Sequence, residues 1–372
     1  MRLTIKNVGT FLMEKGLLSP KSIVDGDFMV TQSQNRNAIF RIHIRNGKSL
    51  FVKQLVSFDP QNSYFLQKDA TCLWLIKNEK TFKSLSEFVP QYYGYDPEKQ
   101  VLIVEYIPEA KNMEEIYQER KLLPPELLQQ VAKILSAYHF TLDQKTLSNR
   151  SVQFFMRQLP WTFQFAASSG ANSHIFDTAQ GANPVVNYLK QNEEFITLMK
   201  HHHKEYQFST LIHGDIKWVN FILPDINDAA TLKLIDWELA DIGDPLWDVA
   251  GIIQSLFTSK ILMTAPNAPL QGGNSITEVQ MNQTMAEIEC LWSAYCRYQG
   301  FKEAAKQSGL KKTLQFAGMR LVQTAFEHNV MSPQILPNTI KLLQVSHSLM
   351  KGADILCEQI FKPNTVSYES VN

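Results

Sequence analysis

Apolar and polar residues alternate along the first part of the chain in the manner of β-strands. The alternation is clearest over residues 39–44, and strict period-two alternation is typical of a strand with one buried face. Asn46-Gly47 is a common tight-turn dipeptide, so it predicts a hairpin into a strand over residues 49–53. A short apolar run over residues 28–30 precedes the polar stretch 31–37. The pattern therefore predicts strand, turn, strand, turn, strand, with a lysine at the end of the third strand.

Beyond a hydrophobic strand predicted at residues 101–107, which Pro108 ends, apolar residues recur at spacings of three and four. This spacing is typical of helices, and it predicts them over residues 124–142, 187–203, 277–298, 301–307, 310–327 and 337–361. We therefore expect an α+β chain with a small strand-rich part over residues 1–105 and a mainly helical part over residues 106–372. Residues 161–183 and 264–275 are rich in residues that break helices. They are predicted to be loops, either with substrate contacts or merely on the surface.

Three oxygen-bearing side chains follow short apolar segments in the middle of the chain: Asp215, Asn220 and Asp236. The apolar segments predict short buried strands that enter and leave a loop, with Asp236 at the end of a hairpin partner. Phosphoryl transfer needs a positioned hydroxyl, a carboxylate that accepts its proton, and oxygen ligands for Mg²⁺. We therefore expect Asp215 to act as the base and Asn220 and Asp236 to hold Mg²⁺.

The sequence around these residues resembles that of a known family. His213-Gly214-Asp215 with Asn220, in the form HGDxxxxN, and the following IDWE at residues 235–238 resemble the aminoglycoside phosphotransferase and choline kinase family. The segment GDPLWDVA at residues 243–250 extends the resemblance. It implies a two-lobed protein-kinase-like fold, with a small antiparallel sheet in the N-terminal lobe, a mainly helical C-terminal lobe, and ATP and Mg²⁺ as cofactors. Asp248 precedes an apolar run, so we expect it to cap a helix rather than to act in catalysis.

The resemblance also implies a phosphate site in the N-terminal part. A lysine at the end of the third strand, here Lys53, would pair with the nucleotide phosphates, and an acid of the next helix, here Asp69, would fix it. A solvated helix position explains Asp69 equally well. The turn at residues 31–37 lacks the usual glycines. It offers instead Ser33, Asn35 and Asn37, whose side chains can bond phosphates or neighbouring backbone.

The segment of residues 101–108 is the predicted hinge between the two lobes, and there the resemblance implies an adenine site. The backbone carbonyl of Glu105 would accept from the adenine amino group, and the N–H of Ile107 would donate to the ring. Apolar side chains would close over both faces of the purine, although ordinary core packing explains them as well: Ile39, Phe51, Ile222 and Ile235.

Two further charged residues lie beside the predicted catalytic positions. Lys217 could neutralise charge on the transferred phosphoryl group, and a solvated loop lysine is an equally good reading. Glu238 could reach a second Mg²⁺ through water or pair with a nearby cation.

Composition narrows the class of protein. The 372 residues are 44% apolar and carry 36 basic and 36 acidic side chains, so they can form two cores but offer no basic field for nucleic acid or a membrane. No signal peptide or membrane span is predicted, and a cytoplasmic protein is expected. Four cysteines without CxxC spacing predict buried reduced thiols: Cys72, Cys290, Cys296 and Cys357.

The sequence thus predicts an ATP-dependent phosphotransferase that moves the γ-phosphate to a hydroxyl of a small molecule, such as a natural product, amino alcohol or sugar. Residues 258–372 hold ten basic and eight acidic side chains, which disfavours a polycationic acceptor. Two alternatives stay open: a catalytically silent nucleotide-binding scaffold and a protein-directed kinase. The acceptor, the choice between ATP and GTP, and the oligomeric state are not predicted.

Overall fold

The computed structural model describes residues 2–34, 36–45, 47–57, 59–142, 153–167, 184–224, 231–263 and 278–361. Its contacts divide the chain into two compact units, each built from two segments. Unit 1 comprises Met1–Leu122 and Trp218–Ala240, and unit 2 comprises Leu123–Lys217 and Asp241–Asn372. The expected division of the sequence into lobes after residue 105 stays a prediction.

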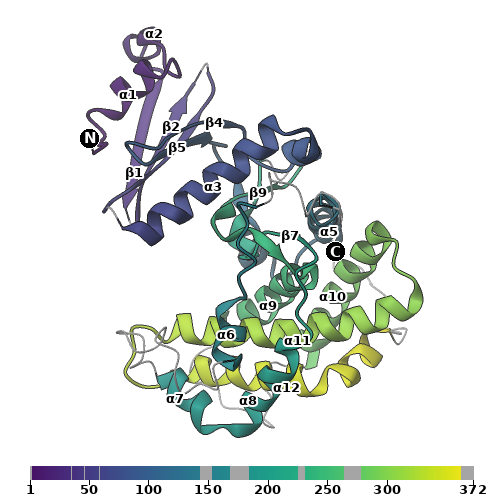
Figure 1. Ribbon diagram of the computed structural model, residues 1–372. Helices are drawn as coiled ribbons and strands as arrows, with labels where there is room; N and C mark the ends of the chain where they lie inside the picture. The colour runs from purple at the N-terminus through teal and green to yellow at the C-terminus, as the bar shows by residue number, and fades with distance from the viewer. Residues whose placement is uncertain are drawn as a thin grey trace. The chain divides into compact units, whose positions relative to one another are not determined.

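Unit 1 is built on a five-stranded antiparallel sheet in the order β1-β2-β3-β5-β4 (Figure 1). The strands are β1 (Phe28–Gln34), β2 (Asn37–Ile44), β3 (Leu50–Leu55), β4 (Tyr92–Asp96) and β5 (Val101–Glu105). On β2, Phe40 and Ile42 are fully buried, whereas Ile39, Arg41 and His43 are only half-buried, as alternation requires. Phe11 and Leu12 of the first helix belong to the same core. The antiparallel N-terminal sheet predicted from the sequence is therefore present.

Two strand ends differ from the prediction. β1 continues through Gln34, so most of the polar stretch predicted as a turn is strand. The reason is that β1 is an edge strand whose last four residues are exposed, and an exposed strand needs no apolar side chains. β3 continues to Leu55, so Lys53 lies inside the strand rather than at its end. Asn35 and Asn46 lie outside the described residues.

Unit 1 also contains a second, smaller sheet of order β6-β8-β9, with β6 (Lys111–Asn112), β8 (Phe221–Leu223) and β9 (Lys233–Leu234). The helices and 3₁₀ helices are α1 (Val8–Glu14), α2 (Pro20–Val24), α3 (Pro60–Asn78), η1 (Lys80–Glu87), α4 (Met113–Arg120), η6 (Trp218–Asn220) and η7 (Trp237–Leu239). Asp59 caps α3 by accepting from the N–H groups of Gln61 and Asn62. α3 packs against η7, which lies far away in sequence.

Unit 2 is mainly helical, as the spacing of apolar residues predicts. Its helices are α5 (Pro125–His139), α6 (Trp161–Ala167), α7 (Pro184–Gln191), α8 (Glu193–His203), α9 (Pro245–Met263), α10 (Glu278–Gln299), α11 (Glu303–His328) and α12 (Pro337–Phe361). α11 packs against both α9 and α12 (Figure 1). One short antiparallel pair joins β7 (Thr210–Ile212) to β10 (Asp241–Gly243).

The helix boundaries correct the sequence reading in three places. Residues 301–327, predicted as two helices, form the single helix α11, and residues 187–203 are divided by Asn192, which caps α8. The first part of the predicted loop at 161–183 is α6, because Phe163 and Phe165 are buried core residues. Residues 168–183 and 264–277 lie outside the described residues.

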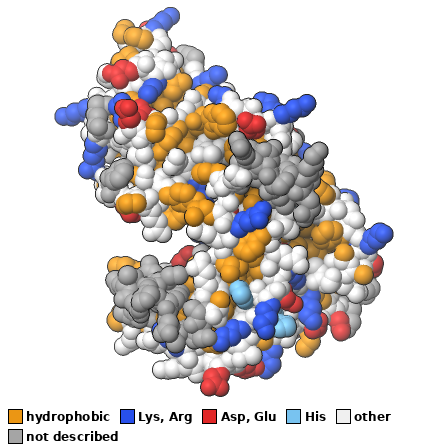
Figure 2. Space-filling model, in the orientation of Figure 1, with side chains coloured by type: hydrophobic (Ala, Val, Ile, Leu, Met, Phe, Trp, Pro, Cys, Tyr) orange, Lys and Arg blue, Asp and Glu red, His pale blue; other side chains and the backbone are white. Residues whose placement is uncertain are grey.

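The remaining expectations concern thiols, membrane spans and charge. The cysteines are reduced, three of them buried and Cys290 half-buried. Among the described residues, no helix is both long and apolar enough to cross a bilayer. On the face drawn in Figure 2, basic side chains are scattered among acidic and uncharged ones.

Candidate active site

A cavity of about 600 Å³ lies within unit 1. Its apolar wall comes from the main sheet, the hinge and the small sheet, through Ile39, Phe51, Leu102, Val104, Ile107, Ile222 and Ile235. Its polar wall carries Arg36, Lys53, Asp69 and Asp236. One wall therefore suits a flat apolar ring, and the other suits a charged group.

Lys53 is the centre of the polar wall. Its Nζ lies 2.7 Å from Asp236 Oδ1, 3.4 Å from Asp69 Oδ2 and 3.4 Å from Glu238 Oε2. Burial disfavours the ammonium, but the three carboxylates outweigh burial and hold the pKa of Lys53 above its usual value. Lys53 is therefore a fixed positive charge at the polar end of the cavity.

Asp69 on α3 is buried and joins two parts of unit 1. Its Oδ2 faces Lys53, and its Oδ1 accepts a hydrogen bond of 3.1 Å from the N–H of Trp237. Burial raises the pKa of Asp69 to about 6, although the ammonium of Lys53 acts in the opposite direction. This is not the environment of a solvated helix position.

The hairpin β8–β9 positions Asn220 and Asp236 at the ends of neighbouring segments. The N–H of Ile235 donates to the carbonyl of Asn220 at 2.9 Å, and Asn220 is buried. Asp236 follows in a left-handed backbone conformation, with φ 68° and ψ 57°. The side chain of Asp236 lines the cavity and is one-third exposed. It therefore combines a cavity position with access for a ligand.

Of the other residues predicted to bind the nucleotide, two line the cavity and one does not. Glu105 and Ile107 line the cavity, and the N–H of Glu105 donates to the carbonyl of Gln91 at 2.8 Å. Ser33 does not line the cavity; it is exposed on β1 and accepts from Arg41 at 3.0 Å.

Sequence reasoning missed several residues that line the cavity, among them Arg36, Arg41, Asn112 and Glu115. Asn112 and Glu115 form a reciprocal capping box at the start of α4, and the spacing N-x-x-E was a signal that could have located this helix start. No sequence signal pointed to Arg36, whose partner Glu238 lies 202 residues away.

The predicted base lies in unit 2, on a loop that follows β7. Gly214 adopts φ +81°, a conformation that favours glycine, and it turns the chain between His213 and Asp215. The carboxylate of Asp248 accepts from the N–H of His213 at 2.6 Å, from the N–H of Gly214 at 3.0 Å and from Tyr138 Oη at 2.7 Å. The backbone N–H groups of His213 and Gly214 thus both donate to the buried carboxylate of Asp248.

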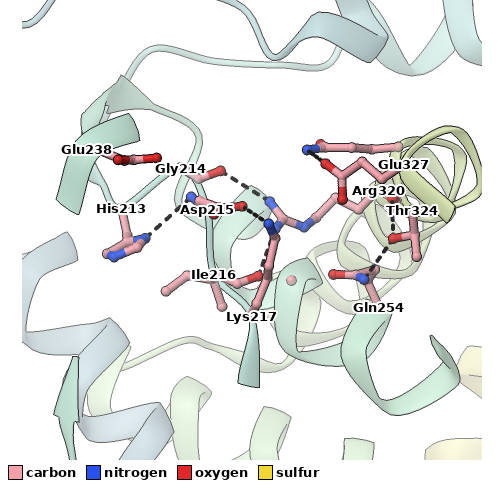
Figure 3. Close-up of polar contacts among 12 residues, drawn as sticks. His213, Gly214, Asp215, Ile216, Lys217, Glu238, Gln254, Arg320, Thr324 and Glu327 are labelled. Atoms are coloured by element: carbon pink, nitrogen blue, oxygen red, sulfur yellow. Dashed lines mark hydrogen bonds and ion pairs between the residues drawn. The ribbon is translucent and has the colours of Figure 1, made fainter. Parts of the chain in front are cut away.

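Arg320 on α11 binds the opposite, carbonyl side of the same loop (Figure 3). It donates to the carbonyls of Gly214 at 3.4 Å and Ile216 at 2.7 Å, and its guanidinium lies 4.9 Å from the ring centre of Trp247. Two oppositely charged buried groups therefore fix the loop that carries Asp215.

Lys217 and Asp215 form an ion pair of 3.0 Å in this loop. Burial acts to lower the pKa of Lys217, but Asp215 and Glu327 raise it above its usual value. The structure thus groups Lys53, Asp69 and Asp236 in unit 1, and Asp215 and Lys217 in unit 2.

The role expected of Asp248 needs correction. It lies inside the first turn of α9 and binds the loop after β7 rather than capping a helix. The cap is Asp244, whose Oδ1 accepts from the N–H of Leu246 at 3.1 Å. Sequence reading mistook one acid for the other because both precede the apolar run of α9.

Comparison with protein families decides what kind of protein carries these groups. The model of the phosphotransferase enzyme family matches residues 80–274, more than half of the chain. The chain belongs to the phosphotransferase enzyme family. The matched region of this phosphotransferase contains Asp215, Asn220, Asp236 and Asp248. No curated protein shows significant similarity to the chain.

Solved structures establish the fold of this phosphotransferase. The ethanolamine kinase of Plasmodium vivax has a TM-score of 0.56 at 12% identity, covering 92% of this chain and 89% of that one. The GDP complex of aminoglycoside 2'-phosphotransferase-IIIa has a TM-score of 0.53 at 15% identity, covering 95% and 99%. A putative fructosamine-3-kinase from Thermobifida fusca has a TM-score of 0.51 at 16% identity, covering 93% and 99%. The predicted kinase-like α+β fold is therefore confirmed.

Proposed function

We propose that this phosphotransferase moves the γ-phosphate of a nucleoside triphosphate, ATP in the first instance, to a hydroxyl of a small molecule. The observation that carries the proposal is the cavity of unit 1, where an apolar wall continues into the pair of buried Lys53 and one-third exposed Asp236, 2.7 Å apart. A purine fits the apolar wall, and Lys53 supplies the positive charge that a polyphosphate requires. Within the described part of the chain, the Ile107 N–H at this wall has no hydrogen-bond partner, so it is available to an adenine ring.

The acidic groups of unit 1 fit a divalent metal. Asp236 and Asn220 offer the hard oxygen atoms that Mg²⁺ prefers, and Asp69 and Glu238 add negative charge nearby. When bound there, Mg²⁺ would neutralise charge on the phosphates. Lys53 orients the phosphates and Asp69 holds the lysine and the backbone at Trp237 in place.

Asp215 is the proposed base. It lies on a loop fixed through Asp248 and Arg320, so its carboxylate is preorganised to orient the acceptor hydroxyl and take its proton. The ammonium of Lys217 lies 3.0 Å from this carboxylate and is proposed to offset charge on the transferred group. The structural neighbours include an ethanolamine kinase, a putative fructosamine-3-kinase and an aminoglycoside phosphotransferase in complex with kanamycin. Ethanolamine, fructosamine and kanamycin compounds are therefore the first acceptors to try.

Asp215→Asn tests this function. We expect nucleotide affinity within about twofold of the wild type and turnover lower by about 100- to 10,000-fold, because general-base catalysis is lost. Calorimetry with MgATP measures the nucleotide affinity. ADP release with a panel of acceptors measures the turnover, and mass spectrometry identifies the product. An unchanged rate would remove Asp215 from the mechanism.

The silent-scaffold alternative predicts a different result in the same assays. It requires MgATP binding without ADP release for any acceptor, including an extract of cellular metabolites. A helix α3 without an acid that reaches Lys53 would favour this alternative, whereas the buried carboxylate of Asp69 lies 3.4 Å from the Lys53 ammonium.

A further inference from the structure

The connection between β1 and β2 borders the polar wall of the cavity in unit 1, and it contains no glycine. From Thr31 to Ala38 every residue carries a side chain. Glycine-rich loops bind phosphates because backbone N–H groups can approach them closely. Without glycine, side chains are the available source of donors at this position.

Arg36 is the strongest donor of this connection. Its Nη2 lies 2.5 Å from Oε1 and 2.6 Å from Oε2 of Glu238, so one guanidinium nitrogen bridges both carboxylate oxygens. Arg36 also lines the cavity together with Lys53 and Asp236. Its side chain is 43% exposed, whereas that of Glu238 is 10% exposed. The arginine therefore reaches a buried acid from the solvent side and can leave it without unfolding its surroundings.

Asn37, the next residue, is a second observation at the same wall. It lines the cavity, its side chain is only 8% exposed, and among the described residues its buried Oδ1 has no hydrogen-bond partner. Buried amides without a partner are rare in proteins. A polar ligand in the cavity would supply the partner.

We propose that Arg36 is a phosphate ligand of the nucleotide and exchanges the carboxylate of Glu238 for phosphate oxygens when the nucleotide binds. The proposal rests on the function proposed above. A guanidinium recognises carboxylate and phosphate with the same planar donor geometry, so the exchange preserves its hydrogen bonds. Arg36 thus replaces the backbone donors of a glycine-rich loop.

Charge balance gives a reason for the exchange. Asp69, Asp236 and Glu238 carry three negative charges, against two positive charges on Lys53 and Arg36. Divalent ions that accompany a nucleotide compensate such carboxylates, so Glu238 no longer requires the guanidinium of Arg36. Arg36 can then compensate the charge of the phosphates.

The register of the sheet places Arg36 at the phosphate end. Ile39 of β2 is the partner of Lys53, whereas Arg41 is the partner of Phe51 on the apolar wall. Arg36 precedes β2 on the lysine side of Ile39. Arg45, which directly follows β2, is exposed and does not line the cavity, so it provides a matched control with the same charge at the other end of the strand.

Calorimetry on the full chain with ATP, ADP and adenosine tests the proposal. We expect Arg36→Gln to weaken ATP binding by about 10- to 100-fold, the range for a charge-assisted hydrogen bond, and to leave adenosine binding within about twofold. Arg45→Gln should change ATP affinity by less than about threefold. Unchanged ATP affinity in Arg36→Gln, or an equal loss in Arg45→Gln, overturns the proposal.

A second comparison separates direct contact from an effect through Glu238. If Arg36 contacts phosphate, Arg36→Gln still weakens ATP binding in a Glu238→Gln background. If the effect disappears there, Arg36 acts only by orienting Glu238, and the proposal is wrong. Thermal unfolding checks each variant's fold, and Arg36→Lys, which keeps the charge but loses the fork, should give an intermediate affinity. Wild-type protein that fails to bind ATP would instead reject the proposed function itself.

Discussion

Asp248 and Arg320 hold the loop that carries Asp215 through its backbone. Asp248 accepts from two amide groups and Arg320 donates to two carbonyl groups of the same loop. Neither role was visible in the sequence: HGDxxxxN identified the loop, but the partners come from α9 and α11. Arg36 and Glu238, 202 residues apart, escaped for the same reason. Motifs locate the reacting groups, whereas the groups that hold them are fixed by tertiary packing.

Arg320→Lys tests the carbonyl side of the loop. We expect turnover to fall by about tenfold or more, with KM for ATP within about twofold. The reason is that an ammonium cannot donate to both carbonyls, and a buried carbonyl left without a donor costs about 1–3 kcal/mol. Steady-state kinetics measure turnover and KM for ATP separately. Arg297→Lys, at an exposed site of α10, is the matched control. A general loss of fold would change both parameters and the unfolding temperature, which contradicts a positioning role.

The pH dependence of the free energy of unfolding tests the role of Asp248, which accepts from the N–H groups of the loop. Burial alone would raise the pKa of Asp248, but His139, His213 and Tyr138 together lower it below its usual value. A depressed folded pKa contributes stability above the unfolded pKa, about 4, and loses it as pH falls through the folded value. We therefore expect the free energy of unfolding to decline below about pH 4 in the wild type, and less steeply in Asp248→Asn. Denaturant titrations from pH 3 to 7 measure the slopes, and equal slopes would contradict the assignment.

At the scale of elements, sequence patterns worked where burial follows a simple period. Alternation found β2 and most of β3, and the helical spacing found α5, α10 and α12 nearly to their ends. The polar end of β1 was missed because an exposed edge strand has no apolar signal. The helix α6 was missed because glycine and serine further along the segment outweighed its buried Phe163 and Phe165.

The packing of α9 against the loop gives a prediction at this scale. A Cβ added at Gly251 would lie 2.5 Å from the carbonyl oxygen of Ile216, so α9 and the loop would have to separate. We expect Gly251→Ala to lower the free energy of unfolding by about 1–3 kcal/mol and to lower turnover as well. Gly352→Ala on α12, where an added Cβ meets nothing within 4 Å, should do neither. Denaturant melts and rate measurements on both variants check the contrast.

At the scale of the whole molecule, unit 1 is assembled from two distant parts of the chain. Residues 218–240 contribute the buried side chains Leu234 and Trp237, and the N–H of Trp237 binds Asp69 of α3. Such a unit leaves no boundary signal in the sequence, since composition does not change where the chain leaves a unit and returns to it.

A fragment of residues 1–122 should therefore not form a stable unit by itself. It lacks the hairpin β8–β9 and η7, which leaves the buried face of α3 exposed to water. We expect weak amide dispersion in its NMR spectrum and no cooperative thermal transition. Joining residues 218–240 to the fragment through a flexible linker should restore both, and a well-folded fragment without them would contradict the expectation.

The left-handed backbone of Asp236 has an evolutionary consequence. Asparagine shares with aspartate a tolerance for this conformation that bulkier residues lack. Their codons differ by one base, so a single transition removes the carboxylate charge while the turn and the cavity persist. Descendants of such a gene would inherit an intact cavity rather than a misfolded chain, and if the cavity binds nucleotides as proposed, selection could then act on binding alone.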